Sequence, residues 1–90
     1  TQKSLKNPYK EIKGYKLVAK ERKGTSEHYL YSDGLASVSL YVDPSKLKEK
    51  SQMSKDSVNG LILGNGSMRV VAIGKVPLIT LESFLIATQN

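Results

Sequence analysis

His28 is the only histidine of the chain, and together with Asp33 and the many serines it supplies the residue types of a hydrolase triad. A serine nucleophile needs a histidine base within hydrogen-bond reach and an acid that orients this base. Nothing in the spacing of these residues fixes such a geometry, and the chain has no Gly-x-Ser-x-Gly elbow. One histidine with scattered carboxylates is an equally poor metal-binding set, and a chain without cysteine can form neither a thiolate site nor a disulfide. The sequence therefore indicates an ordinary strand histidine in a domain that binds and does not catalyse.

Three glycines, Gly60, Gly64 and Gly66, offer a second kind of chemistry, because glycine-rich loops can cradle a phosphate with their backbone N–H groups. A phosphate-binding P-loop ends in lysine followed by serine or threonine, whereas the lysine after Gly74 is followed by valine. Turns between strands account for these glycines without any ligand. The sequence therefore predicts no cofactor.

The positive charge of the chain is concentrated at its N-terminal end. The net charge is +6, and residues 1–23 hold eight basic and two acidic residues, whereas residues 24–90 hold six of each. Such an asymmetry is typical of a basic arm or edge that meets an anionic partner, although lysines also protect exposed edge strands from aggregation. Lysine outnumbers arginine twelve to two, which weighs against nucleic acid, because bidentate recognition of bases and phosphates favours arginine.

The length of 90 residues predicts one small domain with one modest core. No apolar run approaches the roughly 18 residues of a membrane span. The chain begins at Thr1 and not at methionine, so we expect it to be a piece of a longer protein. Residues 1–13 are polar, lysine-rich and broken by Asn7-Pro8, which predicts a linker or lead-in, and residues 14–90 are expected to form the domain.

The first half of the domain alternates between apolar and polar residues, which is the period of half-buried strands. We predict three strands, over residues 15–23, 27–32 and 35–42. As a two-residue loop, Asp33-Gly34 would place Tyr31 opposite Ala36 and Tyr29 opposite Val38, with both tyrosines on the apolar face. A three-residue loop would turn both rings outward, and we favour the two-residue loop because it buries more aromatic area.

The second half divides into a polar segment, a hairpin and a helix. Residues 45–56 hold only two apolar side chains, so we expect a mobile loop there. The apolar runs 61–63 and 68–73 flank Asn65-Gly66, the strongest short hairpin signal. After Pro77, leucines recur at helical spacing, which predicts a C-terminal helix. These elements predict an α+β fold in which an antiparallel sheet of about five strands, a three-stranded meander plus a hairpin, packs against that helix.

Protein-binding residues are expected where charge or an aromatic ring suits a partner. The strand over residues 15–23 and the arm before it hold the basic excess, so this strand should border the binding surface. A tyrosine on the polar face of the strand over residues 35–42 adds amphipathic contact area. The candidate protein-binding residues are Lys16, Lys20, Arg22, Lys23 and Tyr41.

Three segments of the sequence resemble the C-terminal domain of the MucB/RseB family. The most specific is Tyr31–Val42, Tyr-Ser-Asp-Gly-Leu-Ala-Ser-Val-Ser-Leu-Tyr-Val, which resembles the central hairpin of that domain. Gly14–Leu17 resembles the entry to its first strand, and Val70–Pro77 resembles its passage from the last strand to the helix. This last segment carries Lys75 where an acidic residue is more usual. The resemblance covers residues 14–87.

The resemblance implies a negative regulator of an envelope-stress sigma factor, located in the periplasm of a Gram-negative bacterium. Members of the family bind the periplasmic part of a membrane-spanning anti-sigma factor and shield it from the site-one protease. Lipopolysaccharide or another lipid is the implied release signal. A larger lipoprotein-carrier-like domain would precede residue 1, and the small domain would help to grip the anti-sigma factor.

Two other functions stay open on the residues alone. The domain could be a generic envelope or secreted interaction module, or a basic module that binds anionic lipid or polysaccharide. The N-terminal charge favours the basic module, and the neutral remainder of the chain weighs against it. Binding of an anionic ligand would weaken steeply with salt, whereas a peptide held along a strand or in a groove would respond less.

Overall fold

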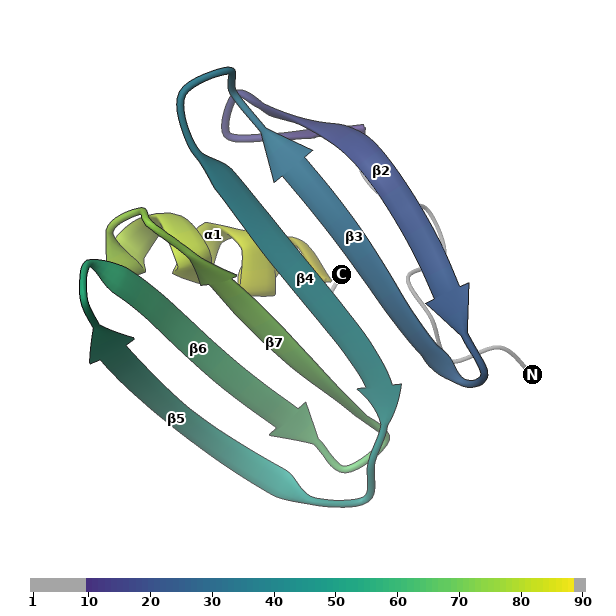
Figure 1. The fold of residues 1–90 in the computed structure, drawn as a ribbon. Coiled ribbons are helices and arrows are strands. Elements are labelled where there is room, and N and C mark those ends of the chain that lie inside the picture. Colours follow the sequence, from purple (N-terminus) through teal and green to yellow (C-terminus); the bar gives the residue numbers. More distant parts are fainter. Residues whose placement is uncertain (1–9, 89–90) are drawn as a thin grey trace.

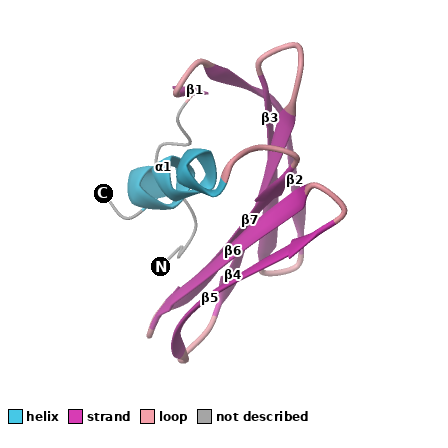
Figure 2. Cartoon of the chain, turned by 90° about the vertical axis from the view of Figure 1, so that its left-hand side faces the viewer, coloured by secondary structure: helices cyan, strands magenta, loops and turns pink. Residues whose placement is uncertain are grey.

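The computed structural model describes residues 10–88, which form one antiparallel sheet of seven strands and one helix (Figure 1). The elements are β1 (Glu11–Ile12), β2 (Tyr15–Lys23), β3 (Ser26–Ser32), β4 (Ser37–Pro44), β5 (Lys48–Lys55), β6 (Val58–Asn65), β7 (Met68–Gly74) and α1 (Leu78–Thr88). The strands lie in the order β1-β2-β3-β4-β7-β6-β5. Figure 2 shows α1 on one side of the sheet, which we call the covered face; the opposite side is the open face. The predicted α+β class is confirmed, but the sheet has seven strands and not about five.

The prediction of a mobile loop over residues 45–56 is wrong, because most of this segment forms β5. This strand pairs with β6 along its whole length, from Lys48 opposite Asn65 to Lys55 opposite Val58. The two residues between the strands, Asp56 and Ser57, have φ values of 51° and 70°, which are the positive angles of a type I′ hairpin turn. Because β5 is an edge strand with exposed side chains on both faces, its sequence lacks the apolar alternation that marks a half-buried strand.

The second additional strand, β1, falls within the segment that the sequence assigns to a linker. Glu11 and Ile12 pair with the start of β2, and the Ile12 side chain is buried in the core, where β1 meets α1. The first nine residues of that segment lie outside the described part of the chain.

Both tyrosines of β3 are fully buried on the covered face, as the hairpin prediction expects. The predicted register is wrong by two residues, since Tyr31 lies opposite Val38 and Tyr29 lies opposite Leu40. A shift of two residues keeps every side chain on its face, because the period of a strand is two. The faces were therefore predicted correctly although the pairs were not.

The register differs because the β3–β4 loop has four residues, 33–36. The Asp33 carboxylate accepts hydrogen bonds from the backbone N–H groups of Leu35 and Ala36, both at 2.8 Å, and the Ser32 hydroxyl accepts one from Gly34 at 3.0 Å. Side-chain oxygens therefore accept the hydrogen bonds of the loop's backbone N–H groups. In a tight two-residue turn, backbone groups of the opposite strand would take this role.

The helix α1 packs across β6, β7 and β1. Its buried side chains, Leu81, Phe84, Leu85 and Thr88, are on the face that the helical spacing predicts. Phe84 meets Tyr31 edge-on with 5.1 Å between ring centroids, and it meets Tyr15 in the same manner at 5.6 Å. The aromatic part of the core therefore lies beneath the β2–β3 side of the sheet.

Candidate protein-binding surfaces

A β-bulge in β2 divides the predicted basic cluster between the two faces of the sheet. The register of β2 against β3 shifts between Leu17 and Ala19, so Val18 has no partner and the alternation changes phase. Residues that lie directly opposite each other share a face. The partners of Lys20 and Arg22 are the buried Tyr29 and Glu27, so both cations lie on the covered face.

Arg22 serves the fold, because it neutralises a buried carboxylate. Its Nη2 lies 3.4 Å from Oε2 of Glu27, which is only 6% exposed. The hydroxyl of Tyr29 donates a hydrogen bond to the other oxygen of Glu27 at 2.8 Å. Burial, followed by this hydrogen bond, raises the pKa of Tyr29, so its hydroxyl stays protonated and keeps donating. Lys20 lies 5.8 Å from the centroid of the same ring.

The other predicted site residues lie on the open face. Lys16 and Lys23 pair with Ser32 and Ser26 on this face, and Tyr41 of β4 is 42% exposed there. The Tyr41 ring stacks on His28 with 4.4 Å between centroids and 6° between planes. The cross-strand pair His28–Tyr41 was missed from sequence, because the predicted two-residue loop would place Ser26 opposite Tyr41.

The candidate catalytic residues are not brought together. His28 stacks on Tyr41 in the middle of β3, whereas Asp33 lies in the loop beyond the end of that strand and binds backbone N–H groups. Those hydrogen bonds lower the pKa of Asp33. Within residues 10–88, no group of three or more histidine, cysteine, aspartate or glutamate side chains is placed to hold a metal ion. No helix within this range is long and apolar enough to cross a membrane.

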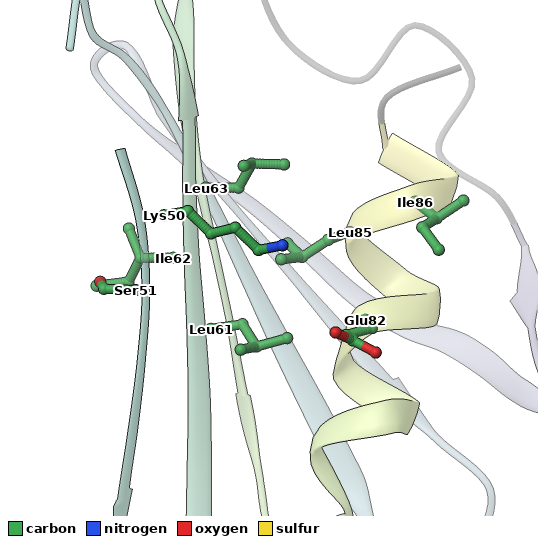
Figure 3. Close-up of a pocket in the computed structure, with 8 residues that line it drawn as sticks. All are labelled: Lys50, Ser51, Leu61, Ile62, Leu63, Glu82, Leu85 and Ile86. Carbon is green, nitrogen blue, oxygen red and sulfur yellow. The ribbon is translucent and has the colours of Figure 1, made fainter. Parts of the chain in front are cut away.

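An apolar groove lies between α1 and the strands β5 and β6 (Figure 3). Its volume is about 240 Å³, and its lining residues are Lys50, Ser51, Leu61, Ile62, Leu63, Glu82, Leu85 and Ile86. Figure 3 shows Leu61 and Leu63 pointing toward the helix, and Ser51 and Ile62 pointing to the other side of the sheet. The leucines therefore supply the apolar floor, and Lys50 and Glu82 stand at its two sides.

The strand β5 borders this groove and forms one edge of the sheet. A glycine lets the chain enter β5 close to β6, since a Cβ on Gly64 would lie 2.7 Å from the carbonyl oxygen of Leu47. Sequence reasoning did not anticipate this edge. Asp56-Ser57, which follows the polar residues 48–55 and precedes Val58, was the available signal, and it is a much weaker turn signal than Asn65-Gly66.

The family model of the MucB/RseB C-terminal domain matches residues 4–89, which is nearly the whole chain. The chain belongs to this family. No curated protein and no solved structure matches the chain. The match confirms the resemblance noted in the sequence, and its range begins within the segment predicted as a linker.

The MucB/RseB domain is the domain of regulatory, non-catalytic proteins that work in the periplasm. A protein-binding role in regulation fits its surfaces. The open face offers a stacked aromatic pair opposite Glu21, with Lys16 and Lys23 farther along β2, and the groove offers apolar contact beside a strand edge. These surfaces lie on opposite faces of one sheet, so one extended partner could contact both only by passing around an edge.

Proposed function

We propose that this MucB/RseB domain binds the periplasmic part of a membrane-spanning anti-sigma factor, shields it from proteolysis and so keeps an envelope-stress sigma factor inactive. The observation that carries this proposal is the family match over residues 4–89. In the parent protein, a lipoprotein-carrier-like domain precedes this one, and the residues before β1 connect the two. Lipopolysaccharide or another lipid acts as the release signal, in the periplasm of a Gram-negative bacterium.

The predicted site residues contribute unequally in this proposal. Lys16, Lys23 and Tyr41 share the open face and meet the partner or the preceding domain. Lys20 and Arg22 act mainly through the fold, because they lie on the covered face beside Tyr29 and Glu27. Lysines speed the encounter with an acidic segment more than they add to affinity.

The basic module that binds anionic lipid or polysaccharide has less support. A polyanion is held best by a contiguous basic surface. The bulge at Val18 instead separates two of the four cations of β2 from the other two, with the sheet between them. A generic envelope interaction module would use the same surfaces with a different partner.

The test is a calorimetric titration of the domain, and of the two-domain parent protein, with the periplasmic part of the anti-sigma factor from the same bacterium. We expect saturable binding and slower cleavage of the bound segment by the site-one protease. In rapid-mixing kinetics at low salt, the variant Lys16→Gln/Lys23→Gln should associate several-fold more slowly than the wild type. The control Lys13→Gln/Lys75→Gln removes the same charge elsewhere and should associate like the wild type. Absence of binding in both proteins, or binding to anionic vesicles alone, would overturn the proposal.

A further inference from the structure

The edge strand β5 has backbone groups that no strand satisfies within the described part of the chain. The carbonyl of Leu47 accepts the N–H of Gly66 at 3.1 Å, and these residues extend the β5–β6 register by one pair. Hydrogen-bonded and non-hydrogen-bonded pairs alternate in an antiparallel ladder, so every second residue from Leu47 to Lys55 faces β6. The residues between them direct their N–H and C=O groups outward: Lys48, Lys50, Gln52 and Ser54.

The side chains of the same outward-facing residues lie on the covered face, next to the groove. Lys50 is opposite Leu63 and Gln52 is opposite Leu61, and both leucines point toward α1 (Figure 3). A further strand would lie about 4.8 Å outside β5. Because directly paired residues share a face, its side chains opposite Lys50 and Gln52 would be directed to the groove side.

We infer that β5 is the docking site for an extended segment of a partner protein, which adds to the sheet as an eighth strand and places apolar side chains in the groove. This inference rests on the proposed function and specifies how the anti-sigma factor's segment is held. Main-chain hydrogen bonds along β5 supply affinity, and alternate side chains in the groove supply specificity. On its groove side the recognised segment carries apolar residues, together with acidic residues opposite Lys48 and Lys50.

Charge selects an acidic segment as the occupant. Four lysines lie along this edge, and none of them forms an ion pair within residues 10–88: Lys46, Lys48, Lys50 and Lys55. The one acidic residue of β5, Glu49, is already paired with Arg69 at 3.4 Å. A second copy of this chain is disfavoured, because two β5 strands side by side would bring their lysines together. The groove of about 240 Å³ falls below the roughly 300–1,000 Å³ of small-molecule sites and suits side chains.

Two single variants with matched controls test this docking mode. Gln52→Pro removes an outward N–H without removing a hydrogen bond to β6, and Gln52→Thr keeps that N–H. Ile86→Glu puts a carboxylate on the groove side of α1, whereas Ile79→Glu makes the same change on the same helix away from the groove. The two isoleucines are 65% and 72% exposed, so both variants should fold.

The probe is the periplasmic part of the anti-sigma factor, titrated into the full chain. We expect Gln52→Pro and Ile86→Glu each to weaken binding about tenfold, and both controls to stay within about twofold. Hydrogen exchange of the wild type should show new protection on binding at Lys48, Lys50, Gln52 and Ser54. The other amides of β5 are already hydrogen-bonded to β6, so the gain in protection should appear only at every second residue.

The outcomes separate this inference from the proposed function. Absence of binding by the wild type overturns the proposed function and the inference that rests on it. Wild-type affinity in Gln52→Pro and Ile86→Glu, with protection confined to the open face, overturns the inference and leaves the function. Protection of β5 that rises with protein concentration, without the probe, shows that a second copy occupies this edge and also overturns the inference.

Discussion

The two edges of the sheet are both rich in lysine, but their cations do different things. On the β2 edge, the bulge at Val18 turns Lys20 and Arg22 onto the covered face, and β1 pairs with the first residues of the strand. On the β5 edge, the pairing with β6 is regular over all eight residues, and its lysines stay exposed.

This difference shows that edge lysines cannot be interpreted from composition alone. A bulge and a short cover strand are known protections of an edge, and the β2 edge has both. The β5 edge has lysines but no bulge and no cover strand in the described residues, and an apolar groove lies beside it. The edge that resembles a binding site is therefore not the one with the larger share of charge.

The largest expected effect concerns the core beneath the two edges. Phe84 is fully buried against Tyr31, whereas Leu85 is buried at the wall of the groove. Phe84→Ala should lower the free energy of unfolding by about 3–5 kcal/mol, because it leaves a cavity. Leu85→Ala should lower it by about 2 kcal/mol, at the low end for leucine, since the lost volume joins space already open to solvent. Urea unfolding followed by circular dichroism measures both, and equal losses would contradict the contrast between the two sides.

The next effect compares a cation from each edge. Arg22→Gln leaves the buried Glu27 with only the hydrogen bond from Tyr29. Loss of one partner from a fully buried ion pair costs about 3–5 kcal/mol, but Arg22 is 49% exposed, so we expect about 1–2 kcal/mol.

Lys50→Gln is the matched change on the β5 edge, and it should alter the free energy of unfolding by less than about 0.5 kcal/mol. Chemical denaturation of both variants gives the comparison. Adding Glu27→Gln to Arg22→Gln removes the unpaired carboxylate and should recover part of the lost stability. If this double variant is no more stable than Arg22→Gln alone, the loss has a cause other than the unpaired carboxylate.

The sequence predicts the parts of this fold that bury one face. Burial produces an apolar pattern in these elements, and each of them was predicted from it. The patterns are the alternation in β3 and β4, the apolar run of β7 and the helical spacing after Pro77. The burial of Tyr29 and Tyr31 follows from the same alternation, and it survives a register error of two residues.

Other parts leave no such record. β5 is exposed on both faces, so its polar sequence is that of a loop until β6 is present to pair with it. The bulge at Val18 depends on how β2 fits β3, and a single inserted residue reverses the faces of Lys20 and Arg22. The His28–Tyr41 stack depends on a loop length that side-chain hydrogen bonds of Asp33 determine. The candidate surfaces were therefore predictable in residue type but not in position.

A smaller effect is expected at the turn that forms the β5 edge. Ser57 has a φ of 70°, which glycine adopts without the steric cost that a side chain brings. Ser57→Gly should raise the free energy of unfolding by about 0.5 kcal/mol and slow hydrogen exchange in β5. The opposite change in the β3–β4 loop, Gly34→Ala at a φ of 94°, should lower it by about 1 kcal/mol. If Ser57→Gly destabilises the protein, backbone strain at this turn does not limit the stability of β5.

The smallest expected effect is on the pH dependence of stability, and it concerns the β3–β4 loop. Side-chain hydrogen bonds stabilise this loop, whereas the β5–β6 turn depends on backbone angles. Backbone N–H groups of Ala36 and Leu35 stabilise the Asp33 carboxylate and lower its pKa in the folded state. A group whose folded pKa is depressed adds stability above its unfolded pKa of about 3.9, and this stability is lost as pH falls through the folded value. Asp33→Asn keeps an oxygen acceptor but cannot titrate, so its stability should fall less between pH 7 and acid than that of the wild type. Urea midpoints across this range measure the difference, and parallel curves would show that the charge of Asp33 does not stabilise the loop. The register of β3 against β4 would then depend on the neutral hydrogen bonds alone.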